Sequence, residues 1–352
     1  MIRLEDRAEV GLWFRERLGT EADDLTVEQV ARISQGVSRE TWIVDAKVVR
    51  GDATTEESFV VRRDLPDGSV IPMPLREEFE VYHRLAASPV PTARALWFED
   101  DPRWQPDERP AYVRTKVDGD WRLDFLSSDD PADDERKIAA SKEHLEKLAL
   151  LHTSDWRALG FGEIGTVPDS PAACATALLD DLRDRLSAFQ FEPSPAVAEG
   201  FAQLRATAPA DAPVIALCKG TNGHGEEVWA GGQIVAMSDW ELWRLGDPAY
   251  DFAQLQEMVP EIVRDGRRLW GWPEALEFYR ERSGIEITPE RLSWYRGCYG
   301  LIQFSYAHHS AHRLAHGAGS IRLAWNASEV QYRSQLKLAS AFGFVPREEI
   351  RT

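Results

Sequence analysis

The chain has 352 residues, of which 43% are hydrophobic and 28% charged, and its formal net charge is -18. This length is sufficient for two lobes with substantial cores, and the composition is that of an ordered globular protein. The negative charge argues against nucleic acid or an anionic membrane as the main partner, because phosphate groups would be repelled. An anionic nucleotide would have to be met by local cations and Mg²⁺.

The cysteines and the first residues favour a reducing, cytoplasmic location. Cys174, Cys218 and Cys298 lie far apart and show no metal-ligand spacing. Residues 1–19 carry charged side chains instead of the apolar core of a signal peptide. No window approaches the roughly 18 apolar residues needed to cross a bilayer.

The first third of the chain predicts a helix followed by a sheet. Residues 1–32 are expected to form a helical lead-in with an apolar face around Trp13 and Phe14. Residues 33–44 predict a strand, a polar turn with one glycine and a returning strand. A third strand is expected over Ser58–Asp64.

A helix is predicted over residues 75–87, followed by two further strands at 93–99 and 111–119. Pro89 and Pro91 end the helix, and a Pro-rich turn separates the strands. We place a domain boundary near residue 118, which divides the chain into domains 1–118 and 119–352.

The second part is predicted to be mainly helical around one β-rich segment. Helices are expected over 133–154 and 171–203, the latter with a break at 193–195. The β-rich segment comprises a strand at Val214–Cys218, a glycine-rich polar loop, a Gly-Gly turn and a strand that leads to Asp239. The remaining helices are expected over residues 252–259, 272–283, 289–313 and 321–342.

Two motifs in this segment, Asp239-Trp240-Glu241 and Gly246-Asp247-Pro248-Ala249-Tyr250-Asp251, resemble those of the aminoglycoside phosphotransferase and choline kinase family. The resemblance implies an α+β, two-lobed protein-kinase-like fold. Its small lobe would hold an antiparallel sheet plus a helix, and its larger lobe would be mainly helical. It also implies that Asp251 braces the catalytic loop and that His152, in Leu-x-x-Leu-His, is structural.

The loop departs from the family pattern His-Gly-Asp-x-x-x-x-Asn, because Lys219, Thr221 and Glu226 stand at the three defining positions. The family Asp orients the nucleophile or takes its proton, which a threonine hydroxyl cannot do at neutral pH. Glu226 could still bind metal with Asp239, since hard cations prefer oxygen ligands. Under a kinase interpretation Lys219 would neutralise the transferring phosphoryl group, and the proton would leave through His224, Glu227 or solvent.

The resemblance also implies a site for Mg²⁺ with ATP or GTP. The hairpin of residues 33–44 resembles the phosphate-covering hairpin of the family, although a plain β-hairpin is the alternative. Arg62 would meet the phosphates and pair with Glu78, with Arg63 as the alternative cation. The strand at 111–119 resembles the hinge that meets the adenine. The expected nucleotide-binding residues are Ser34, Gly36, Ser38, Arg62, Glu78 and Arg114.

Three functions remain open from the sequence. The first is a phosphotransferase that acts on a hydroxyl of a small molecule, the second a pseudokinase that binds without transfer, and the third different chemistry such as nucleotidyl transfer, a lyase step or an isomerase step. The acceptor, the nucleotide base and the oligomeric state are undetermined. The stripe of His308, His312 and His316 could bind metal, or it could form a polar helix face or a pocket wall. If it faces the cleft, His309 or His312 could bind an anionic acceptor. The later helices would wall an acceptor pocket with some of their aromatics, Tyr299 and Tyr306 among the candidates, while most aromatics at helical spacing would lie in the core.

Overall fold

The computed structural model describes residues 2–33, 38–189 and 194–341, and the chain divides into two compact units. The first unit comprises the residues up to Ala87 together with Thr92–Val117, and the second comprises Ser88–Pro91 and the residues from Asp118 onward. In the described ranges, none of the helices has the length and apolar character that crossing a membrane requires.

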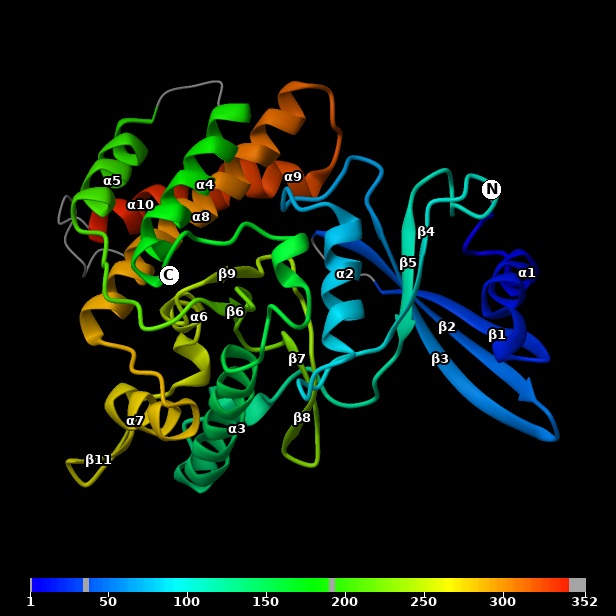
Figure 1. The fold of residues 1–352 in the computed structure, drawn as a ribbon, viewed down its shortest axis with the longest axis horizontal. Coiled ribbons are helices and arrows are strands. Elements are labelled where there is room, and N and C mark those ends of the chain that lie inside the picture. The colour runs from blue at the N-terminus through cyan, green and yellow to red at the C-terminus, as the bar shows by residue number, and fades with distance from the viewer. Residues whose placement is uncertain (1, 34–37, 190–193, 342–352) are drawn as a thin grey trace. The chain divides into compact units, whose positions relative to one another are not determined.

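The first unit is built on a five-stranded antiparallel sheet in the order β1-β2-β3-β5-β4 (Figure 1). Its strands are β1 (Asp24–Ile33), β2 (Arg39–Arg50), β3 (Ala53–Asp64), β4 (Ala95–Glu99) and β5 (Ala111–Thr115).

Helices α1 (Arg7–Leu18) and α2 (Leu75–Leu85) pack on opposite faces of this sheet. Phe14 of α1 packs edge-on against Trp97, whereas Phe79 of α2 packs against Phe98, the next residue of β4. Adjacent residues of a strand point to opposite faces, so each helix buries its apolar stripe on its own side.

The predicted helical lead-in over residues 1–32 is only partly correct, because Asp24–Ile33 forms strand β1. Leu25 and Val27 are buried, whereas Asp24, Thr26 and Glu28 are exposed. This alternation has the period of a strand, and pairing with β2 satisfies the backbone.

The second unit is mainly helical, which agrees with the predicted α+β class. Its helices are α3 (Asp134–His152), α4 (Cys174–Phe189), α5 (Pro195–Ala206), α6 (Ala249–Phe252), α7 (Trp272–Ser283), α8 (Pro289–Ala315), α9 (Ile321–Trp325) and α10 (Gln331–Ala341). A π-helical segment, Asn326–Val330, joins the last two.

Short β-pairs connect these helices: β6 (Ala216–Cys218) with β9 (Arg244–Gly246), β7 (Glu227–Ala230) with β8 (Gln233–Met237), and β10 (Ile262–Arg264) with β11 (Arg267–Trp270). The predicted hairpin with the Gly231-Gly232 turn is confirmed. The predicted helix over 252–259 is wrong, since α6 ends at Phe252 and only a 3₁₀ turn comes after it. The β10–β11 hairpin was not predicted, although its Asp265-Gly266 turn is a typical hairpin signal.

Candidate active site

The loop of residues 219–226 leaves the end of β6 and enters β7. Two of its glycines have a positive φ, +87° at Gly220 and +100° at Gly225. A Cβ atom on Gly220 would lie 2.2 Å from the carbonyl oxygen of Leu242, so only glycine allows this close approach. The loop is therefore held tightly against the segment that continues from Asp239.

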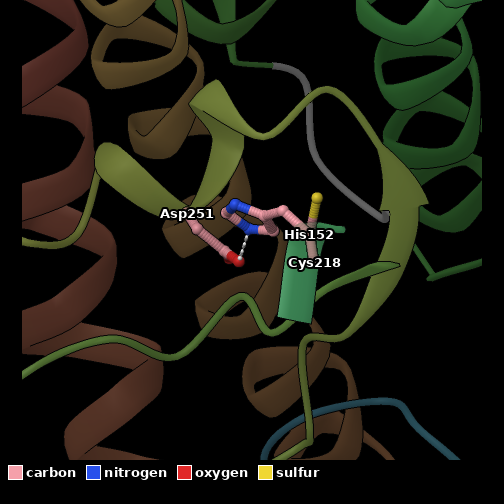
Figure 2. A group of neighbouring side chains, drawn as sticks. All are labelled: His152, Cys218 and Asp251. Carbon is pink, nitrogen blue, oxygen red and sulfur yellow. Dashed lines mark hydrogen bonds and ion pairs between the residues drawn. The ribbon is translucent and has the colours of Figure 1, made fainter. Parts of the chain in front are cut away.

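The buried carboxylate of Asp251 fixes the start of the loop. It accepts hydrogen bonds from the backbone N–H groups of Lys219 (2.8 Å) and Gly220 (2.6 Å) and from Nδ2 of Asn222 (2.9 Å). Nε2 of His152 lies 2.8 Å from the same carboxylate (Figure 2). The bracing role predicted for Asp251 and the structural role predicted for His152 are confirmed.

His152, Cys218 and Asp251 also form the one group within the described ranges whose ligand atoms could surround a metal ion, all within 4.8 Å of one another (Figure 2). The Asp251 oxygens are already occupied by the loop. Burial raises the pKa of the Cys218 thiol well above its usual value, so the thiol keeps its proton. We therefore interpret this cluster as structural.

Within the described residues, the structure does not support a metal site at the histidine stripe. His308, His312 and His316 succeed one another along α8 and its C-cap, and His308 is buried against Phe304 and Phe189. No three metal-ligating groups that include them converge in the described part of the chain. His308 is therefore part of the aromatic packing of α8, whereas His316 is exposed at the end of this helix.

The predicted role of Lys219 at the phosphoryl group is contradicted by its position. Its side chain is fully buried, its ammonium lies 3.1 Å from Oε1 of Glu227, and it donates to the backbone oxygen of Thr221. Burial raises the pKa of Glu227 to about 7, although the charge of Lys219 acts against this shift. Lys219 therefore stabilises the inside of the loop.

Two of the three predicted exits for the acceptor proton, His224 and Glu227, are also not supported. Nε2 of His224 accepts a hydrogen bond of 2.7 Å from the backbone N–H of Leu123, and Glu227 is buried. The hydroxyl of Thr221 donates to the backbone oxygen of Asp239. The loop therefore offers no accessible carboxylate or imidazole at the position of the family Asp.

Glu226 and Asp239 remain the candidate oxygen ligands for a cation. The hydroxyl of Ser238 donates to the backbone oxygen of Glu226 at 2.7 Å, which ties the two segments together. The half-buried carboxylate of Glu226 has no hydrogen bond or ion pair with any residue that the structure describes. Asp239 has a φ of +61°, a conformation that non-glycine residues adopt rarely and often at functional sites.

The first unit contains a buried ion cluster around Glu78. The predicted ion pair with Arg62 is present at 3.4 Å, and Tyr112 donates to the same carboxylate at 2.8 Å. Arg39, which belongs to the predicted hairpin of residues 33–44, also donates to Glu78 and lies 2.9 Å from Asp64. Burial works against the charged form of Glu78, but the two arginines outweigh it and lower its pKa.

The other residues predicted to bind the nucleotide lie outside the Glu78 cluster or beyond the described residues. Arg63, the alternative to Arg62, pairs instead with Glu40 at 2.6 Å. Arg114 lies over the ring of Tyr82, 5.2 Å from its centre. Ser38 immediately precedes β2, whereas Ser34 and Gly36 lie outside the described residues.

The buried imidazole of His144 is expected to make the stability of the protein fall at acidic pH. Its Nε2 lies 3.5 Å from Oδ1 of Asn222, and burial, together with the charge of Lys219, lowers its pKa from 6.5 to about 3. Between these values the unfolded chain binds a proton that the folded chain excludes, so stability falls as the pH decreases below 6.5. Between pH 7.5 and 5, wild type should lose about 2 kcal/mol more than His144→Gln in urea unfolding. Equal losses would contradict a buried neutral imidazole.

The family model described as "APH: Phosphotransferase enzyme family" matches residues 29–295. The chain belongs to this family. The match includes both the Glu78 cluster and the loop braced by Asp251. Among the curated proteins that were compared, no match was found.

Solved structures of phosphotransferases share the kinase-like fold of this family member. A protein from Ralstonia eutropha JMP134 with the provisional name aminoglycoside phosphotransferase is 19% identical, with a TM-score of 0.66 over 96% of this chain and 98% of that one. A thermostable mutant of APH(4)-Ia in complex with ADP and hygromycin B is 16% identical, with a TM-score of 0.58 over 98% and 100%. The macrolide 2'-phosphotransferase MphH from Brachybacterium faecium is 19% identical, with a TM-score of 0.54 over 90% and 96%.

Proposed function

We propose that the protein binds a magnesium–nucleotide complex and transfers a phosphoryl group to a hydroxyl of a small molecule. The observation that carries this proposal is the pair of Glu226, whose carboxylate has no partner among the described residues, and Asp239, held at a positive φ in the adjoining segment. Two carboxylates suit Mg²⁺, which prefers hard oxygen ligands. When bound, Mg²⁺ would neutralise charge on the nucleotide phosphates.

The remaining nucleotide contacts are inferred from the family. Arg62 would contact the phosphates, and Glu78 would hold its guanidinium in place, as their ion pair of 3.4 Å suggests. Arg39 would keep Glu78 charged in the buried cluster. The relatives in complex with ADP and with ATP support a nucleotide as the ligand.

Transfer would proceed without a side-chain base at position 221. Phosphoryl transfer depends chiefly on positioning and charge stabilisation, and the acceptor proton could leave to solvent. Thr221 would serve as a positioning residue, because its hydroxyl holds the backbone at Asp239. We expect a slow enzyme.

Calorimetry with ATP and GTP, each with and without Mg²⁺, tests nucleotide binding directly. We expect saturable binding that Mg²⁺ strengthens, and product analysis should show ADP or GDP. The appearance of AMP or GMP would indicate nucleotidyl transfer instead. The absence of heat with either nucleotide under both conditions would remove the proposal.

A pseudokinase is the second candidate, because Thr221 lacks a base and Lys219 is locked to Glu227. Thr221→Asp separates the two functions. If the loop is a reaction centre, restoring a carboxylate should raise the rate of ATP hydrolysis about 100-fold or more. Thr221→Val is the control, since it loses the hydrogen bond to Asp239 and gains no base. Unchanged hydrolysis in Thr221→Asp, with intact nucleotide binding, would favour the pseudokinase.

A further inference from the structure

Two arginines of the second unit share a single carboxylate. Nε of Arg185 on α4 lies 2.9 Å from Oδ1 of Asp181, and Nη1 of Arg244 on β9 lies 3.7 Å from Oδ2. Neither guanidinium has another hydrogen bond or ion pair with a residue that the structure describes. One carboxylate balances one of the two positive charges, so a positive charge remains together with N–H groups that have no acceptor.

This arginine pair, Arg185 and Arg244, adjoins the candidate active site. Arg244 is the register partner of Cys218, the residue that immediately precedes the loop. Helix α4 contacts both β9 and α8, all within the second unit (Figure 1). Arg244 therefore lies on the short β-pair that leads into the loop, and Arg185 lies on a helix that contacts this β-pair.

Two half-buried tyrosines, Tyr299 and Tyr306, lie on α8, the helix that packs against α4. Burial raises the pKa of the Tyr306 hydroxyl, and the charge of Arg185 acts on it in the opposite direction. Burial also raises the pKa of Tyr299 to about 12, with a contribution from the charge of Glu226. The charges of Arg185 and Glu226 therefore both act on side chains of α8, the helix that packs against α4.

We propose that Arg185 and Arg244 bind an anionic group, a carboxylate or a phosphate, on the acceptor molecule. The inference rests on the proposed function, because it assigns the acceptor of the same site. A guanidinium binds both groups through paired hydrogen bonds. A polycationic acceptor such as an aminoglycoside would be repelled here. In a chain with a net charge of -18, a positive surface beside the loop would select for the anionic end of a substrate.

Calorimetry without nucleotide tests the site, with inorganic phosphate in one series and malonate in another. Wild type should bind at least one of the two saturably, and the preferred anion distinguishes a phosphate from a carboxylate. Arg185→Gln and Arg244→Gln should each weaken binding about tenfold or more. Arg244→Lys keeps the charge but loses the paired hydrogen bonds, and we expect an intermediate loss.

Three further variants make the assignment specific. Arg183→Gln is the matched control, because Arg183 lies on the same helix but pairs with Asp180. Arg62→Gln removes phosphate binding at the proposed nucleotide site, and anion binding should persist in both controls. Asp181→Asn should strengthen anion binding, because it removes the competing carboxylate, whereas a purely structural Asp181 would give weaker binding.

Two results would overturn the proposal: no saturable binding of either anion, or binding that is equal in wild type, Arg185→Gln and Arg244→Gln. Thermal unfolding of each variant verifies that it is folded. Failure of the anion site can be distinguished from failure of the proposed phosphotransferase function. Anion binding without nucleotide binding would contradict the phosphotransferase, and nucleotide binding without anion binding would contradict only the acceptor assignment.

Discussion

Replacing Asp251 with alanine is expected to lower the free energy of unfolding by about 4 kcal/mol. The carboxylate is fully buried and accepts from two backbone N–H groups and the Asn222 amide, with His152 beside it. Alanine would leave these donors buried without an acceptor, which costs more than the loss of the bonds alone. Urea unfolding followed by tryptophan fluorescence measures the difference.

Asp155→Ala is the matched control for this effect. Asp155 is exposed and accepts from the backbone N–H groups of Arg157 (3.1 Å) and Ala158 (3.0 Å). Water can replace the Asp155 carboxylate as the acceptor, so we expect the free energy of unfolding to fall by about 1 kcal/mol or less. Equal losses in the two variants would show that Asp251 is not the support of the loop.

The β-rich segment around the loop could be predicted from the sequence because its signals are local. The Gly231-Gly232 turn fixes the β7–β8 hairpin, and the Asp239-Trp240-Glu241 motif lies just beyond the end of β8. The Arg62–Glu78 pair was also predictable, because the third strand and the helix after it each carry a clear pattern. In each case a few neighbouring residues determine the outcome.

The orientations of the loop side chains could not be predicted, because they depend on partners far along the chain. His224 is held by the backbone of Leu123, a hundred residues away, and Asn222 lies between His144 and Asp251. The sequence places Lys219 in a polar loop, but it does not show that the lysine side chain is buried in an ion pair with Glu227.

Two further residues were missed for the same reason. Arg39 was treated as part of the hairpin, yet it is a buried partner of Glu78. Arg244 carries no motif of its own, and it gains a role only because β9 pairs with β6. Long-range pairing of this kind is set by tertiary packing.

Asp239→Asn is expected to weaken the binding of Mg·ATP about 100-fold while changing stability little. Asparagine is the informative substitution because it tolerates the positive φ of +61°, whereas alanine would add backbone strain to any loss of a metal ligand. If Asp239 acts by holding the cation, the variant should bind ATP without Mg²⁺ as tightly as wild type does. Only the gain in ATP affinity that Mg²⁺ produces in wild type should disappear. Calorimetry at two Mg²⁺ concentrations measures this gain.

The matched control is Asp265→Asn in the β10–β11 turn. Asp265 is exposed and also has a positive φ, +52°, so the substitution has the same backbone requirement without a proposed ligand role. It should bind Mg·ATP as wild type does. If Mg²⁺ still raises the ATP affinity of Asp239→Asn as it does in wild type, this carboxylate is excluded as a cation ligand. Glu226, whose carboxylate has no partner in the described chain, would then be the residue to replace, and Glu226→Gln tests it in the same assay.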